Sequence, residues 1–312
     1  MKAVYWFKTI IVFMYLAITM TGLITNTLSF VVFSRKRFSN TIFSTYFRLY
    51  IIFQTLNLIL PINQALELNF NIYFVKLSNF TCKFFTYLAF FNSSIPAWLL
   101  VLISIDRFIS IAYPTKFLFK NTLKFQLITC LLMAILNICV YSPVLLFHLK
   151  KSEIFNYQTN RSELTYSCER IGFWFHLIDL FQSTIIPFTL MSLTSIFTVK
   201  KVFESRKLIS NNNSNKNKSN DLKFAIISIT TNIVFLAYSV PYFVYTLITE
   251  FSSLLTNLDT DVILLIHSIS YLCFFVHIID VFFINILVNS LFKNELKILF
   301  GKENKLAPSQ IL

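Results

Sequence analysis

The sequence has little charge and almost no glycine. Of its 312 residues only 13% are charged and three are glycine, whereas 56% are hydrophobic and 37 are phenylalanine. A soluble globular domain carries roughly 25% charged residues, so we expect a lipid bilayer, rather than water, to cover this much apolar surface. The scarcity of glycine argues against a glycine-rich phosphate loop or a dinucleotide-binding fold.

Groups that could perform catalysis or hold a metal are also scarce. The four histidines are scattered along the chain, and no Cys/His cluster has the spacing of zinc ligands. No nucleophile, base and metal ligands converge in the sequence, as a membrane enzyme would require. We therefore expect a protein that is not an enzyme and that needs no cofactor.

Seven blocks of the sequence are apolar and approach the roughly 20 residues that a helix needs to cross hydrocarbon. They cover approximately residues 9–33, 45–66, 82–112, 125–147, 173–199, 224–248 and 262–287. The first block is too long for a signal peptide and lacks a small-residue cleavage site, so it is expected to be retained. Prolines inside some of the blocks predict kinks: Pro96, Pro143, Pro187 and Pro241.

These features predict an all-α membrane protein, namely a seven-transmembrane helix bundle. The segment from Ser290 to Phe300 interleaves apolar residues with lysine, which predicts a short amphipathic eighth helix along the membrane surface. The seven-helix domain is expected to occupy residues 1–300, and residues 301–312 form a short tail. We find no internal repeat and no separate soluble domain.

The distribution of lysine and arginine predicts the orientation. With seven spans the two termini lie on opposite sides, and the connections on the C-terminal side hold 19 of the 27 basic residues, against 8 on the other side. The positive-inside rule therefore places the N-terminus outside and the C-terminus in the cytoplasm. We expect the protein in the plasma membrane. The net charge of +13 follows from this topology, so we expect anionic membrane lipid, and no nucleic acid, as a partner.

The outer connections carry two predicted modifications. Asn79 and Asn160 begin Asn-x-Ser/Thr sequons and are candidate glycosylation sites. Cys82 and Cys168 lie near the outer surface, whereas the other three cysteines lie at membrane depth. A disulfide between them would fix the fourth-to-fifth connection over the mouth of the bundle, and two unpaired thiols are the alternative.

The segment from Leu102 to Pro114, LISIDRFISIAYP, places Asp106 and Arg107 side by side at the cytoplasmic end of the third block. Ionisable residues at a membrane boundary are costly unless they are paired or hydrated. Adjacent opposite charges that face the bundle indicate a conformational switch. An interfacial pair that merely reaches toward water is the alternative.

Asp106, Arg107 and Phe108, with the trailing Pro114, resemble the motif at the same place in rhodopsin-like G-protein-coupled receptors. Cys82 stands 25 positions before Arg107, which is the separation that the family uses. Further positions across the whole chain resemble the family's helix signatures: Gly22, Asn26, Pro187, Phe235 and Pro241. The resemblance implies a receptor that transmits the binding of a small molecule or peptide to a heterotrimeric G protein.

The sequence departs from the family in the second, sixth and seventh helices. Thr55 stands near the place of the sodium-site aspartate, Ser239 replaces the sixth-helix tryptophan, and DVFFIN from Asp280 to Asn285 replaces N-P-x-x-Y. The resemblance therefore gives no basis for sodium binding or for the usual activation details. With these departures the chain looks most like the nematode serpentine chemoreceptors of class gamma or V.

The resemblance also implies a switch mechanism. In the resting state Arg107 would pair with Asp106, and also with Asp221 at the inner end of helix six. Outward movement of helix six would break that bridge and open a cleft for the G protein. A solvated Asp221 at the edge of an Asn-rich loop is the alternative.

The ligand is expected in the outer half of the bundle, where polar residues face a cavity. The resemblance places six candidates there: Asn92, Ser93, Asp179, Ser183, Tyr242 and Tyr271. Asp179 is the most informative, because a buried carboxylate needs a partner; for the others, packing between helices is an equal alternative. Ala89 stands where amine receptors carry an aspartate, which disfavours a monoamine ligand.

A multi-pass transporter or channel is the main alternative function. It would show paired repeats, broken helices or a file of ionisable residues across the membrane. Only Asp179 and Asp280 lie at depth in this sequence. The motif spacing therefore favours a receptor.

Overall fold

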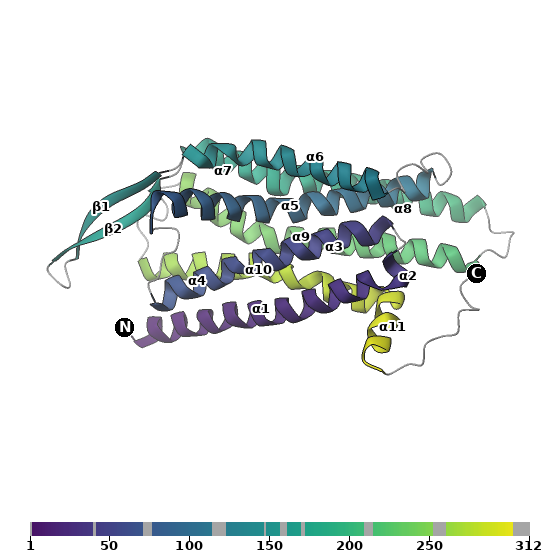
Figure 1. The fold of residues 1–312 in the computed structure, drawn as a ribbon, viewed down its shortest axis with the longest axis horizontal. Helices are drawn as coiled ribbons and strands as arrows, with labels where there is room; N and C mark the ends of the chain where they lie inside the picture. The colour runs from purple at the N-terminus through teal and green to yellow at the C-terminus, as the bar shows by residue number, and fades with distance from the viewer. Residues whose placement is uncertain are drawn as a thin grey trace.

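The computed structural model is a bundle of long helices that run side by side along one axis (Figure 1). It describes residues 2–39, 42–70, 77–113, 123–146, 148–156, 161–169, 172–208, 215–251 and 260–301. Seven helical segments are long and apolar enough to span a membrane: Trp6–Ser34, Ser44–Leu68, Asn79–Ala112, Lys124–Leu146, Phe175–Lys201, Ile229–Thr249 and Leu265–Val288. They confirm the predicted seven-helix membrane bundle.

Several spans consist of more than one helical element. The first, third, sixth and seventh spans lie within α1 (Lys2–Ser34), α5 (Asn79–Ala112), α9 (Asn215–Phe251) and α10 (Thr260–Val288). The second span comprises α3 (Ile42–Asn57) and α4 (Ile59–Phe70), and the fourth comprises α6 (Leu123–Tyr141) and the 3₁₀ helix η3 (Ser142–Leu146). The fifth comprises α7 (Gly172–Leu180), the π-helical segment η4 (Phe181–Ile185) and α8 (Ile186–Leu208).

The two ends of the bundle carry different structures. At one end, β1 (His148–Asn156) and β2 (Arg161–Glu169) form an antiparallel hairpin between the fourth and fifth spans. At the other end lie the short helices α2 (Lys36–Ser39) and α11 (Ser290–Leu299) (Figure 1). We call these the hairpin end and the α11 end. The sequence analysis did not predict the hairpin.

The break in the second span follows from a proline that the sequence analysis did not weigh. Pro61 has no N–H, and its ring crowds the carbonyl four residues before it, that of Asn57. The helix α3 ends at Asn57. The next N–H, that of Leu58, donates to the carbonyl of Thr55, three residues back rather than four, at 3.2 Å. The span is therefore two helices joined at one turn residue.

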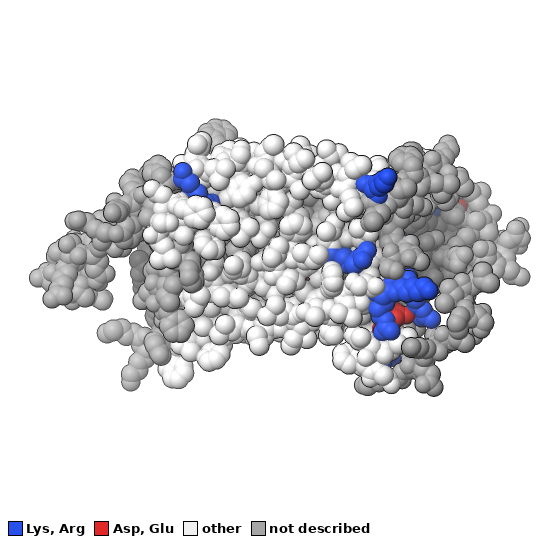
Figure 2. Space-filling view, in the orientation of Figure 1, with Lys and Arg blue, Asp and Glu red and all other residues white. Residues whose placement is uncertain are grey.

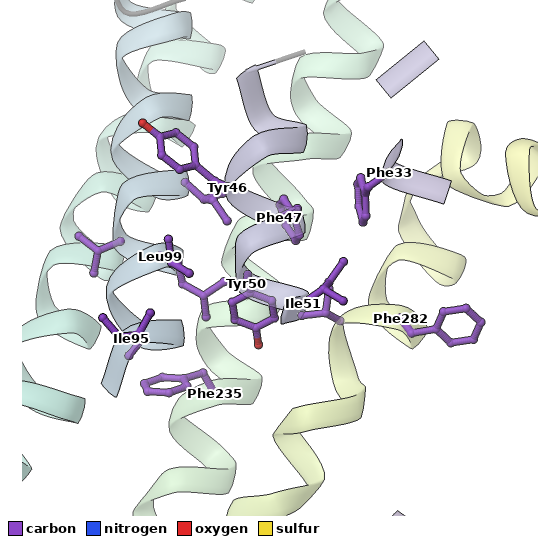
Figure 3. Packing of buried hydrophobic residues seen from close by; sticks show 14 of the residues in the cluster. Phe33, Tyr46, Phe47, Tyr50, Ile51, Ile95, Leu99, Phe235 and Phe282 are labelled. Atoms are coloured by element: carbon purple, nitrogen blue, oxygen red, sulfur yellow. The ribbon is translucent and has the colours of Figure 1, made fainter. Parts of the chain in front are cut away.

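An aromatic core holds the α11 end together (Figure 3). The ring of Phe33 in α1 stacks on Phe47 of α3 at 5.0 Å and lies 5.4 Å from Phe292 of α11. Phe282 of α10 lies 6.0 Å from the same Phe292 ring. The predicted amphipathic eighth helix is thus confirmed as α11, which buries one face against spans one and seven.

The flanks of the spans are apolar and exposed. In the fourth span the exposed side chains recur along one side of the helix: Leu127, Ile128, Leu131, Leu132, Ile135 and Leu136. Figure 2 shows a broad belt without charge across the visible face, with most of its basic side chains toward the α11 end. A belt of this kind suits hydrocarbon, which accepts apolar side chains that water would not.

Candidate functional site

A cavity of about 440 Å³ lies within the bundle toward the hairpin end. Its wall is formed by residues of α4, α5, α7, η4, α9 and α10, so five of the seven spans contribute to it. Small-molecule sites in proteins have volumes of roughly 300–1,000 Å³ and combine apolar walls with a few polar groups. This cavity has both properties.

Five of the six predicted ligand residues line the cavity: Ser93, Asp179, Ser183, Tyr242 and Tyr271. They come from the third, fifth, sixth and seventh spans. Asn92 is not part of the wall; it is buried, and its carbonyl accepts a 2.9 Å hydrogen bond from the side-chain amide of Asn57 in α3. Its position therefore favours the alternative of helix packing.

Asp179 is held from two sides. The hydroxyl of Tyr141, at the end of α6, donates to Oδ1 of the carboxylate at 2.9 Å, and both side chains are buried. The hydroxyl of Ser183 donates to the Asp179 carbonyl at 2.6 Å. This supplies the partner that a carboxylate at membrane depth requires.

The backbone after Asp179 is π-helical. The N–H of Ile186 donates to the carbonyl of Phe181, five residues back rather than four. Pro187 follows and has no N–H for the carbonyl of Ser183, so a regular α-helical ladder cannot continue there. Such π-segments are rare in proteins, and those that occur often lie at functional sites.

Aromatic rings join the sixth and seventh spans at the cavity wall. The ring of Tyr242 lies 4.8 Å from that of Tyr271 and 5.0 Å from that of Phe274. The imidazole of His267 lies 4.4 Å from the Tyr271 ring. Two predicted residues therefore belong to one continuous aromatic surface that also includes rings the sequence analysis did not name.

A polar face of α4 was missed by the sequence analysis. Asn63, Gln64 and Glu67 line the cavity together with Leu60. Their spacing of three, four and seven residues from Leu60 places them on one side of a helix. The sequence contains this signal: polar residues at helical spacing at the end of the second apolar block indicate a polar helix face.

Asp106, Arg107 and Phe108 lie in the last turns of α5, at the α11 end. Asp106 is buried, and its carbonyl accepts a 2.8 Å hydrogen bond from the Ser110 hydroxyl. Arg107 is half-buried. The ring of Phe108 lies 6.1 Å from that of Phe197 in α8, so the motif is packed against the fifth span.

The remaining predicted sites are only partly described. Asn79 is exposed as the first residue of α5, whereas Asn160 and the side chains of Asp221 and Cys168 fall outside the described residues. Cys82 is completely buried, and the three other cysteines whose side chains are described are free thiols. The pairing of Cys82 with Cys168 stays a prediction.

No group of three or more His, Cys, Asp or Glu side chains could hold a metal ion within the described part of the chain.

The family model described as 7 transmembrane receptor (rhodopsin family) matches residues 25–292, which extend from α1 into α11. No curated protein matches the chain.

Proposed function

Because the chain belongs to the rhodopsin family of seven-transmembrane receptors, we propose that it is a chemosensory G-protein-coupled receptor of the plasma membrane. One observation carries the proposal: a single helix, α5, runs from the cavity to the Asp-Arg motif. Ser93 lines the cavity, and Arg107 follows on the same helix about 20 Å away, at 1.5 Å per residue. A ligand in the cavity and a G protein at the α11 end would thus contact two parts of one continuous helix.

Helix six has the same reach, which supports its role as the moving element. The helix α9 extends from Asn215 to Phe251, so it contains Asp221 near one end and the cavity residue Tyr242 toward the other. A ligand that contacts Tyr242 more favourably in one position of α9 would bias that position. The bridge from Arg107 to Asp221 would then form in the resting state and break as the helix moves outward.

The family members that we propose as nearest are the nematode serpentine chemoreceptors of class gamma or V. The support is the set of departures from the common family motifs, and two of these lie in the protein interior. Ser239 is fully buried in α9, and Asp280 is buried in α10. A small hydroxyl and a carboxylate at these depths differ from the large ring and the proline motif of most family members.

We place the α11 end in the cytoplasm and the N-terminus outside. The basic side chains of Arg35, Lys36, Arg37, Lys293 and Lys297 lie at the α11 end, and the described part of α11 has the amphipathic form of a helix at a membrane surface. Anionic lipid headgroups would be attracted to these cations. In this orientation Asn79 and Asn160 face the outside for glycosylation, and we expect Cys82 to form a disulfide with Cys168.

The test is expression of the full chain in cultured cells with a tag at each terminus. Intact cells should bind antibody to the N-terminal tag only. A panel of volatile, peptide and lipid ligands is then applied while cAMP and calcium are recorded. A ligand response that disappears in Arg107→Ala and persists in Lys124→Ala, an exposed cation of the fourth span, supports coupling through the motif. A response that survives in Arg107→Ala contradicts it, and ligand-dependent uptake or current would favour a transporter or channel.

The proposed bridge has its own test. Asp221→Asn removes the negative charge and should raise signalling in the absence of ligand at unchanged surface expression. The matched control is Glu204→Gln, an exposed acidic residue of α8. Unchanged basal signalling in Asp221→Asn removes the bridge from the mechanism, while the rest of the proposal stands.

A further inference from the structure

The cavity wall contains acidic side chains and one histidine. Glu67 of α4 and Asp179 of α7 line the cavity with His267 of α10, and the described wall contains neither lysine nor arginine. Ala89 of α5, which also lines the cavity, carries no charge. The negative charge therefore comes from the second and fifth spans, on separate helices, and not from the third.

The carboxylate of Asp179 is oriented but not saturated. Tyr141 donates to its Oδ1, and the nearby hydroxyl of Ser183 donates to the main chain. A carboxylate has about four acceptor positions on its two oxygens, so it can accept further hydrogen bonds from a ligand while Tyr141 keeps it in place. A hydrogen bond between ionised and cationic groups is roughly twice as strong as one between neutral groups.

Aromatic rings line the same cavity as these carboxylates. Besides Tyr242, Tyr271 and Phe274, the wall contains Phe85 of α5 and Phe275 of α10. The face of an aromatic ring attracts a cation within about 6 Å of its centre, most strongly where water is excluded. The same rings provide apolar surface for the uncharged part of a ligand.

From this combination we infer that the cavity binds a small organic cation, whose positively charged nitrogen pairs with Asp179 and Glu67 and whose apolar body lies against the ring wall. The inference rests on the proposed function, since it names the ligand class of that receptor's cavity. An anionic ligand would add a further negative charge to a wall that offers no described lysine or arginine. Holding like charges together in a desolvated site is costly, so this wall favours a cation over an anion.

The charge preference can be measured without knowing the ligand or using a signalling readout. In a receptor whose free cysteines Cys130, Cys139 and Cys273 are replaced by alanine, Ser93→Cys or Thr86→Cys places one thiol in the cavity wall. Each purified variant is reacted with trimethylammonium-ethyl methanethiosulfonate and with sulfonatoethyl methanethiosulfonate. The ratio of the two rates is normalised to the ratio for free 2-mercaptoethanol.

A cleft lined by one sign of charge raises the local concentration of the opposite sign roughly 10-fold to 1,000-fold. The normalised ratio at both cavity thiols should therefore favour the cationic reagent by about tenfold or more. Ser142→Cys, an exposed position of η3 outside the cavity wall, should give a ratio near one. Glu67→Gln and Asp179→Asn should each reduce the cavity ratio, and the double variant should bring it to the level of the control.

Equal rates, a preference for the sulfonate, or a ratio that neither neutralisation changes would each overturn the inference. So would a lack of reaction at both cavity thiols, because a ligand cavity has to be reachable. Each neutralised variant is first shown to be monodisperse in detergent, and the two variants report independently if one does not fold. A preference for the cation without any G-protein response would contradict the proposed function alone, and an anionic agonist would contradict this inference alone.

Discussion

Arg35, which directly follows the first span, forms an ion pair with Glu295 of the amphipathic helix α11. Nε of Arg35 lies 3.1 Å from Oε2 of Glu295, and Nη1 of the same guanidinium donates to the Glu295 carbonyl at 3.3 Å. Nη1 of Arg37 lies 3.1 Å from the other carboxylate oxygen. The Glu295 side chain is only 4% exposed, so one buried carboxylate ties the connection between spans one and two to α11.

Glu295→Gln should destabilise the receptor, because it leaves two arginines without their anion. Breaking a buried ion pair costs roughly 3–5 kcal/mol, and we expect about 2 kcal/mol here because the arginines are partly exposed. Thermal unfolding in detergent measures the loss. Glu204→Gln, which removes the exposed bridge to Lys201, is the control and should leave Tm unchanged. Equal Tm values for both variants would show that the Glu295 bridges do not stabilise the fold.

Phe292→Ala should loosen α11 from the bundle. The ring is fully buried between Phe33 and Phe282, and its removal leaves a cavity in the aromatic core. Phe-to-Ala changes in protein cores cost about 3–5 kcal/mol. We expect faster hydrogen exchange in α11 together with a lower Tm. Phe300→Ala, an exposed ring just after the same helix, should change neither quantity. Unaltered exchange in Phe292→Ala would mean that other contacts hold α11.

Tyr141→Phe should weaken the cavity wall at Asp179. The change removes the 2.9 Å hydrogen bond to the carboxylate and keeps the ring contact with Phe90 at 5.8 Å. The expected loss is about 1–2 kcal/mol, seen as a lower Tm in detergent. The matched control is Tyr87→Phe. The Tyr87 ring stacks on Phe91, and its hydroxyl makes no described hydrogen bond to a carboxylate. A smaller effect of Tyr141→Phe than of this control would contradict the described geometry.

Asn137→Ala should weaken the attachment of the fourth span. Its Oδ1 accepts a 2.6 Å hydrogen bond from the hydroxyl of Ser94 in α5, and the side chain is completely buried. Hydrogen bonds between helices in membranes contribute about 0.6 kcal/mol on average and about 1.7 kcal/mol at most, which sets the expected range. Ser142→Ala removes only a local bond to Cys139 and serves as control. Double-mutant cycles with Ser94→Ala measure the coupling directly, and additive losses would argue against a shared bond.

The seven spans could be predicted from the sequence because a span is a local property. The fourth span needs only a long run of apolar residues between polar flanks, and the positive side of the chain follows from simple counting. Gly22 was noted for its resemblance, and the structure adds a physical reason. A Cβ there would lie 2.6 Å from the side chain of Leu58, so the first span packs closely on the break in the second.

The missed features depend on contacts between distant residues. Glu295 is one charge in an amphipathic helix until the structure places it between two arginines some 260 residues away in the chain. Glu67 directly follows the second predicted span, residues 45–66, and the residues that face it across the cavity come from four other spans. The hairpin β1–β2 carries nine residues in each strand, and a prediction built from apolar blocks does not include a strand pairing in the connection between two of them.

The π-helical turn divides the fifth span into two halves that can be set independently. Each residue advances an α-helix by about 100°, since a turn holds 3.6 residues. Deleting one residue between Phe181 and Ile185 would therefore rotate Asp179 away from Tyr141 by about that angle while the rest of α8 stayed in register. A receptor built in this way can acquire a new recognition surface by indels of single residues at this turn, without repacking the half that reaches the opposite membrane surface.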